Sequence, residues 1–196
     1  MPCTFHSAAV APPRSDVMKQ MVRLVAAAST LAALATTSAC KGRGAADDAF
    51  RPLDVGMAVP SYLATTLARD TVRIGGAEAP TVLNVWATWC VSCAEEMNAL
   101  DSLQQEFGAR GLRVIGVSVD QGDAARVQRF VEANHLQFTI AHDPSAVIEQ
   151  QFQVVGVPTT FVISRDGRLL WSHAGNIGPV MADARRAITT AIGGSE

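Results

Sequence analysis

The sequence predicts an α/β domain in which helices flank a mixed central sheet. The apolar run at residues 82–86 is typical of a buried strand, and apolar side chains then recur at helical spacing from 97 to 107. Farther along the chain, residues 159–164 and 168–173 show strand patterns on either side of a short turn. Strand–helix alternation followed by a hairpin predicts parallel and antiparallel pairs within one sheet.

The remaining elements of the domain follow from patterns of the same kind. Asp123 is a suitable N-cap for one helix, and Asp143 and Pro144 are expected to open another, with the proline in its first turn. In chain order, we expect a strand at 112–119, a helix from 123 through 131, a strand at 138–141, a helix from 143 through 152 and a last helix from 178 to 193.

Two cysteines, Cys90 and Cys93, lie where the predicted strand at 81–86 gives way to a helix. Unpaired backbone N–H groups and the helix dipole favour an anion there, so we expect the pKa of Cys90 to be lower than that of a free cysteine. Cys93 follows by almost one helical turn, close enough to form a disulfide and less exposed. Cys90 is therefore the expected attacking sulfur.

A C-x-x-C pair can also be half of a zinc site. Structural zinc requires about four ligands, usually from a second C-x-x-C or a close histidine pair, and the sequence contains neither. Three solitary histidines, His135, His142 and His173, are expected to have structural or surface roles. The sequence therefore favours redox use of the cysteine pair and predicts no metal site.

Two motifs in this chain resemble a known family. The sequence WATWCVSC at 86–93, followed by Glu96, and the sequence GVPTTF at 156–161 are similar to thioredoxin-fold proteins of the TlpA/ResA type, which include reductases of cytochrome c maturation. The resemblance covers about residues 53–192. The chain departs from the family at three positions: Ser92 stands where many relatives have proline, Ala94 where Arg or Lys is common, and Asn98 where proline often follows.

This resemblance implies a thioredoxin fold with two additions. Residues 62–74 match the family's N-terminal hairpin, and about 121–142 match an extra helix and strand that thioredoxin itself lacks. Asn84 occupies the position at which thioredoxins have a buried aspartate that relays protons to the second cysteine. Proton transfer is therefore expected to depend on another group.

The resemblance also implies a set of substrate contacts. Pro158 is expected to follow a cis peptide bond and to face the cysteine pair, which leaves the backbone of Val157 free to pair with a substrate strand. Trp89 is expected to form a partly exposed wall of the site. Glu96 has two interpretations: a first-turn acid favoured by the helix dipole, or an acid beside the site that tunes Cys93 and transfers its proton.

The N-terminal part of the sequence has the pattern of a targeting segment. Residues 1–39 are expected to be a leader, with Met18 as an alternative start, a positive region at Lys19 and Arg23, and an apolar run of about twelve residues that is too short to span a membrane. Ser38-Ala39-Cys40 resembles the end of a lipobox, which predicts lipidation of Cys40, and ordinary signal cleavage is the alternative. Residues 40–52 are the expected tether, and 53–193 the folded domain.

Charge and cysteine content agree with this division. The 196-residue chain has a formal net charge of −2, and loss of a leader with three basic residues and one acid makes it −4. No basic segment suggests nucleic-acid binding. With Cys3 removed and Cys40 modified or removed, only Cys90 and Cys93 remain, which suits a working dithiol rather than a stabilising framework.

The leading hypothesis is a thiol–disulfide oxidoreductase outside the cytoplasm that uses Cys90 as nucleophile and Cys93 as resolving thiol, with no further cofactor. The resemblance implies reduction of clients such as apocytochrome c, with electrons from a membrane thiol–disulfide donor. A general periplasmic disulfide oxidase or isomerase is the alternative. A peroxiredoxin-like peroxidase is disfavoured because Ala87 stands where the motif P-x-x-x-[ST]-x-x-C has Ser or Thr. A copper chaperone that uses His173 is disfavoured because such proteins have C-x-x-x-C spacing, whereas this chain has C-x-x-C.

Overall fold

The computed structural model describes residues 51–76 and 78–193, and the predicted leader, Cys40 and most of the tether lie outside these residues. A five-stranded sheet has the order β5-β4-β3-β6-β7. Its strands are β3 (Thr81–Trp86), β4 (Arg113–Ser118), β5 (Thr139–His142), β6 (Thr159–Ile163) and β7 (Leu169–Ala174). The mixed sheet expected from the sequence is confirmed, because β3 runs parallel to β4 and antiparallel to β6.

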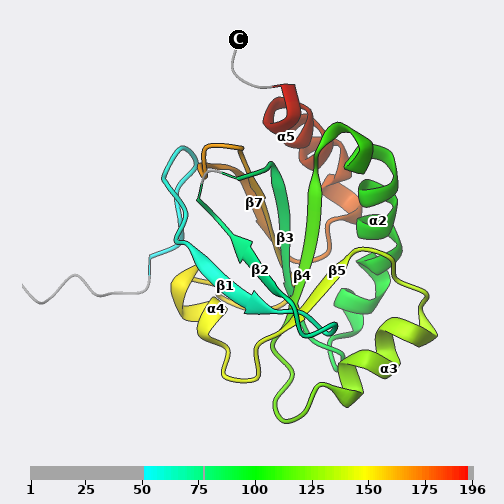
Figure 1. Cartoon of the computed structure of the whole chain (residues 1–196). Coiled ribbons are helices and arrows are strands. Elements are labelled where there is room, and N and C mark those ends of the chain that lie inside the picture. Colours follow the sequence, from blue (N-terminus) through cyan, green and yellow to red (C-terminus); the bar gives the residue numbers. More distant parts are fainter. Residues whose placement is uncertain (1–50, 77, 194–196) are drawn as a thin grey trace, which may run out of the picture. The chain divides into compact units, whose positions relative to one another are not determined.

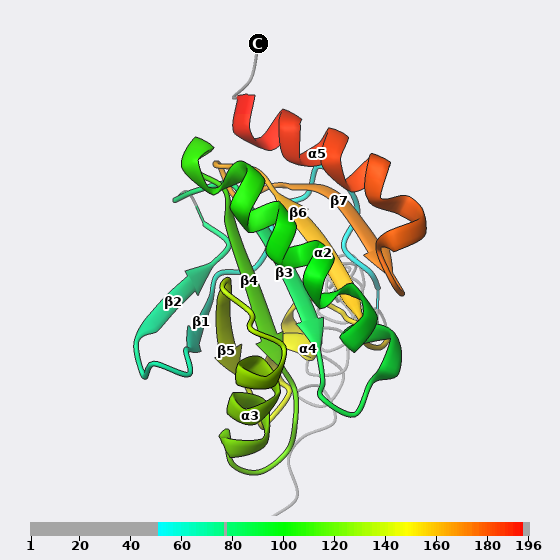
Figure 2. The ribbon, with the colours of Figure 1, turned by 90° about the vertical axis from the view of Figure 1, so that its right-hand side faces the viewer.

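The helices cover both faces of this sheet. They are α2 (Val91–Phe107), α3 (Ala125–Ala133), α4 (Val147–Gln151) and α5 (Met181–Gly193), with short 3-10 turns η2 (Gly108–Arg110) and η3 (Gly178–Val180). Figures 1 and 2 show α2, α3 and α5 on one face and α4 on the other. All six residues of β3 are buried, as expected for a central strand covered on both sides.

The N-terminal hairpin expected from residues 62–74 is present as β1 (Tyr62–Thr65) and β2 (Thr71–Ile74), which pair antiparallel. Its turn is attached to the free edge of the main sheet. Thr66 forms a bridge with Ala141, and the N–H of Leu67 donates to the carbonyl of Ile140 at 3.0 Å. The hairpin therefore covers backbone groups of β5 that would otherwise form an open sheet edge.

The helix and strand expected over about 121–142 are α3 and β5. Phe130 of α3 packs on Trp86, the last residue of β3, with ring centroids 5.1 Å apart. Gly116 in β4 permits this arrangement, because a Cβ there would lie 3.0 Å from Trp86 Nε1 and from side-chain atoms of two further neighbours. The inserted helix thus packs on the strand that leads directly into the cysteine motif.

Three predicted helix starts are wrong by a few residues. Ala124, not Asp123, is the N-cap of α3, although the Asp123 carboxylate still accepts the N–H of Ala125 at 2.8 Å, as a capping side chain does. α4 begins at Val147 after a left-handed Ala146, so the expected proline in its first turn lies outside the helix. The last helix is preceded by η3, which contains Pro179, and α5 itself begins at Met181.

The side chain of Asp143 explains the late start of α4. Its Oδ2 accepts the N–H of Ile148 at 2.8 Å, which satisfies a first-turn donor from outside the helix.

The described residues contain no helix that is both long enough and apolar enough to cross a membrane.

Candidate active site

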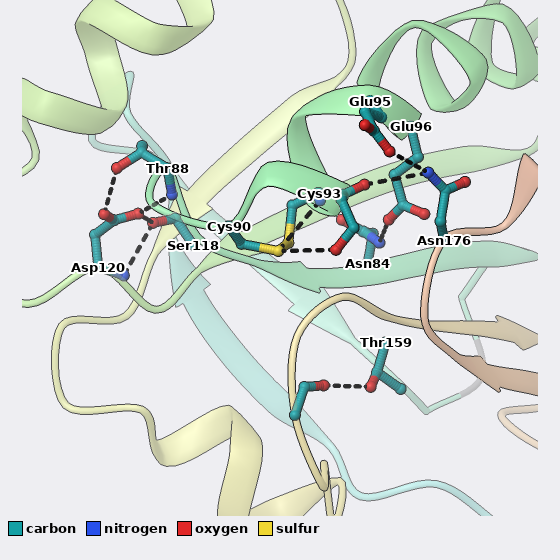
Figure 3. Close-up of a disulfide and its surroundings, with 12 residues drawn as sticks. Asn84, Thr88, Cys90, Cys93, Glu95, Glu96, Ser118, Asp120, Thr159 and Asn176 are labelled. Carbon is teal, nitrogen blue, oxygen red and sulfur yellow. Dashed lines mark hydrogen bonds between the residues drawn. A yellow bond between two sulfur atoms is a disulfide. The ribbon is translucent and has the colours of Figure 1, made fainter.

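The two cysteines form a disulfide at the start of α2, with their Cα atoms 5.2 Å apart (Figure 3). Cys90 is the N-cap of the helix and is separated from β3 by only three residues. Cys90 retains 7% of its surface exposed, whereas Cys93 is completely buried. An incoming molecule can therefore reach Cys90 more easily than Cys93.

Polar groups surround the sulfur of Cys90. The Cys93 N–H donates to the Sγ of Cys90 at 3.2 Å, and the hydroxyl of Ser92 lies 3.5 Å from the same sulfur. These donors belong to the first turn of α2, where the helix dipole also favours negative charge. The arrangement can stabilise a thiolate on Cys90 once the disulfide is reduced.

Glu96 lies beside Asn84 on the side of the disulfide toward Asn176 (Figure 3), and it is buried, with 1% of its surface exposed. Its Oε1 accepts a hydrogen bond from Asn84 Nδ2, and its Oε2 accepts one from the Ile177 N–H, both at 2.8 Å. Burial raises the pKa of Glu96 to about 7, while the two hydrogen bonds oppose that shift. The interpretation of Glu96 as a first-turn acid is wrong, because α2 begins at Val91 and the side chain points into the protein.

Asn84 holds this carboxylate from the central strand. Its Nδ2 donates to Glu96 and, at 3.0 Å, to the hydroxyl of Thr160 on the neighbouring strand β6. Asn84 is fully buried, and its Oδ1 has no hydrogen-bond partner among the described residues. At the position where thioredoxins have aspartate, this chain therefore has a neutral group that supports a nearby acid.

A loop before η3 is also attached to the first turns of α2. Asn176 Nδ2 lies within hydrogen-bond distance of the Ser92 carbonyl (3.4 Å) and of Glu95 Oε2 (3.3 Å). Together with the bond from Ile177 to Glu96, these contacts connect residues about 80 positions apart in the sequence to the disulfide region. No local pattern around Asn176 in the sequence indicates this role.

Asp120 fixes the loop in front of Cys90, a role that no motif in the sequence indicates. Its carboxylate accepts hydrogen bonds from the Thr88 N–H (2.8 Å), the Thr88 hydroxyl (2.6 Å) and the Ser118 hydroxyl (2.8 Å). Asp120 is 2% exposed. Asp120 follows β4 closely, and the carboxyl end of β4 lies beside the carboxyl end of the parallel strand β3, which leads to Cys90. This position in the sequence was the available signal that Asp120 lies near the cysteine motif.

We expect Asp120→Ala to lower the free energy of unfolding by about 2–3 kcal/mol, because it leaves the Thr88 N–H without its charged acceptor. Urea denaturation of the oxidised variant and of the original chain measures the difference. Asp123→Ala is the matched control, since Asp123 is an exposed acid three residues away whose carboxylate accepts only the Ala125 N–H. An equal loss in both variants would contradict the special role of Asp120.

The expected substrate-contact residues have the following environments. The Val157–Pro158 peptide bond is cis, and Pro158 is buried. Within the part of the chain that the structure describes, neither backbone group of Val157 forms a hydrogen bond with another backbone group. Trp89 is 64% exposed, as expected for a wall of the site, and Val91 and Val155 are also exposed apolar side chains.

Two of the histidines, His142 and His173, contact protein groups outside the cysteine pair. His142 Nε2 lies 2.8 Å from the Asp120 carbonyl, and the His173 ring stacks on Trp171 at a centroid distance of 5.9 Å. Among residues 51–76 and 78–193, no cluster of three or more His, Cys, Asp or Glu side chains is arranged to hold a metal ion.

This fold and this cysteine pair define a thioredoxin-like protein with a redox disulfide at a helix N-terminus. The AhpC/TSA family model matches residues 55–172, and the chain belongs to that family. It is also distantly homologous to thiol–disulfide oxidoreductases of the ResA and DsbE type, which confirms the resemblance seen in the motifs and assigns the chain to this enzyme class.

Individual relatives show how distant the homology is. Thiol-disulfide oxidoreductase ResA of Bacillus thuringiensis subsp. konkukian is 29% identical over 119 residues, which are 60% of this chain and 68% of the relative. Thioredoxin-like protein YneN of Bacillus subtilis is 30% identical over 125 residues, covering 62% and 72%. A crystal structure of a putative thiol:disulfide interchange protein DsbE from Chlorobium tepidum superposes with a TM-score of 0.66 at 25% identity, covering 71% of this chain and 99% of that one.

Proposed function

We propose that this protein reduces disulfides of client proteins outside the cytoplasm, with Cys90 as the nucleophile and Cys93 as the resolving thiol. The observation on which the proposal depends is the disulfide at the start of α2, in which Cys90 keeps 7% of its surface exposed and Cys93 none. A nucleophile must reach a client, whereas a resolving thiol needs only to reach its partner three residues away.

The reaction comprises two exchanges. The Cys90 thiolate attacks one sulfur of a client disulfide, a bond forms between the two sulfurs, and the second client sulfur leaves as a thiolate that takes up a proton. The Cys93 thiol then loses its proton and attacks Cys90 Sγ, which releases the first client sulfur. Two electrons pass from the dithiol to the client, and the Cys90–Cys93 disulfide of the structure is the oxidised product.

Glu96 is the group that we propose accepts the proton of Cys93. It lies one helical turn beyond Cys93 on the same side of α2, and its pKa of about 7 allows both protonation states at neutral pH. Hydrogen bonds from Asn84 and from the Ile177 N–H hold the carboxylate in place in both steps. This arrangement supplies the proton transfer for which thioredoxins use a buried aspartate.

Clients are expected to bind across Trp89, Val157 and Pro158. The unpaired backbone of Val157 supports this proposal, because a client strand that pairs with it would satisfy both groups. The exposed side chains of Trp89 and Val91, which flank Cys90 in the sequence, offer apolar contacts beside the disulfide, and Val155, two residues before Val157, is also exposed.

The reducing direction, apocytochrome c-like clients and a membrane electron donor are the finer parts of this proposal, and the family resemblance supports them. Rapid acid quenching of cells followed by thiol alkylation tests the direction. We expect the Cys90–Cys93 pair to be mostly reduced in cells. A mostly oxidised pair would contradict this direction and favour a general disulfide oxidase or isomerase.

We further propose that Cys40 is lipidated and anchors the domain at the outer side of a membrane. Cells that express the chain should incorporate a fatty-acid analogue into it, and Cys40→Ser should abolish the label while Cys3→Ser, within the predicted leader, should not. Absence of label together with a soluble product would instead support ordinary secretion.

A further inference from the structure

An open depression of about 590 Å3 lies between the loop in front of Cys90 and the inserted helix α3. Trp89 lines it from the cysteine motif, and Arg126 and Arg129 line it from α3. The two arginines are three residues apart, so they lie on one face of the helix, while Val127 and Phe130 face the core. The depression therefore joins the redox site to a pair of positive side chains.

Two acids, Asp120 and Asp123, also line the depression, and each already accepts hydrogen bonds from neutral groups of the protein. Asp120 accepts three hydrogen bonds from Thr88 and Ser118, and the Asp123 carboxylate accepts the Ala125 N–H. Arg126 and Arg129 are both exposed, and among the described residues neither of them forms an ion pair or a hydrogen bond. The surface thus offers unused guanidinium donors in a chain whose net charge is negative.

The walls of the depression are held in place. Asp120 fixes Thr88, the neighbour of Trp89, and the contact between Phe130 and Trp86 holds α3 against β3. Two guanidinium groups on one helix face can recognise carboxylates, because each presents a planar set of N–H donors that is always charged. Glu95 lies on the side of the disulfide toward Asn176, so the charge around the site is uneven.

We propose that Arg126 and Arg129 select client segments that have acidic side chains beside the reactive cysteine, with Trp89 contacting an apolar neighbour in the same segment. This inference rests on the proposed function, since it concerns clients of the Cys90–Cys93 pair. Charge complementarity at the edge of an interface mainly raises the association rate, and this effect on the rate becomes smaller as the salt concentration rises. Client choice would then depend on α3, which thioredoxin lacks.

The test uses the full chain in its reduced form and three synthetic disulfide peptides that differ only beside one cysteine, with two Glu, two Gln or two Lys residues. Alkylation and mass spectrometry follow formation of the Cys90–Cys93 disulfide and yield a second-order rate constant. We expect the Glu peptide to react about tenfold faster than the Lys peptide at low salt, and the ratio to approach one as ionic strength rises.

The variants Arg126→Glu and Arg129→Glu should each invert or abolish this preference. Arg165→Glu is the matched control, because Arg165 is exposed in the β6–β7 turn at the opposite end of the sheet and has no ion pair among the described residues. Each substitution changes the net charge equally. The ratio between peptides also cancels any change in Cys90 reactivity that a nearby charge produces.

A preference for the Glu peptide that both α3 variants lose and Arg165→Glu retains would support the proposal. Equal rates for all three peptides with the original chain, or an equal loss in Arg165→Glu, would overturn it. Failure of the proposed function is distinguishable, because the chain would then also fail to react with the neutral Gln peptide.

Discussion

Replacing Cys93 by serine should convert a transient mixed disulfide into a product that accumulates. The substitution removes the buried resolving sulfur and leaves Cys90 at the helix start, where it still attacks clients. After alkylation in cells, we expect non-reducing gels of Cys93→Ser to show about tenfold more client attached than gels of Cys90→Ser, because the remaining sulfur in the second variant is inaccessible. Mass spectrometry of the trapped proteins would identify the clients.

The control for this experiment is a variant that lacks both cysteines of the pair. The Cys90→Ser, Cys93→Ser double variant should trap nothing, which shows that attachment uses this cysteine pair and not Cys3 or Cys40. Equal trapping by the two single variants would contradict the division of roles. Absence of trapping by either would count against the proposed function itself. Precursors of c-type cytochromes among the clients would support the finer proposal.

Glu96→Gln should change the pH dependence of stability. Burial raises the pKa of Glu96 from 4.5 to about 7 in the folded chain, so between these values the folded state keeps a proton that the unfolded state releases. The stabilising contribution is complete below about pH 4.5 and is lost as the pH rises through about 7. Relative to the original chain, the variant should gain about 3 kcal/mol in unfolding free energy between pH 4.5 and 8.

Urea denaturation of the oxidised protein at several pH values measures this difference. Glu95→Gln is the matched control, because Glu95 is the exposed neighbour on the same helix. In the reduced protein, Glu96→Gln should also lower the apparent pKa values of the coupled thiol pair, since it removes a nearby negative charge. Parallel stability curves and unchanged thiol titration would eliminate Glu96 as a tuning group.

Elements dominated by burial were predictable from the sequence. The central strand occupies Thr81–Trp86 in the structure, as expected, because its apolar run is covered on both faces. Helix starts were less predictable, since the carboxylates of Asp123 and Asp143 bind backbone N–H groups from turns that precede the helices. A side chain that favours an N-cap favours such turns for the same reason.

The cysteine pair could be located from local spacing, but the surroundings of the disulfide could not. The Glu96 carboxylate accepts hydrogen bonds from Asn84, 12 residues away, and from Ile177, 81 residues away. Only the folded chain brings these groups together. Asp120 contacts Thr88 across 32 residues in the same way. Motif comparison therefore suggested that Glu96 is important, whereas its burial and hydrogen-bond partners required the structure.

The inserted segment with α3 and β5 leaves the sheet after β4 and returns at its edge, so none of its residues lies between β3 and its partners. It contacts the cysteine motif through the packing of Phe130 on Trp86. Evolution could therefore exchange this segment as a module that alters which clients bind, while the dithiol chemistry stays the same. Grafting it onto a relative, with the Phe130 contact preserved, would be a direct route to redirecting client choice.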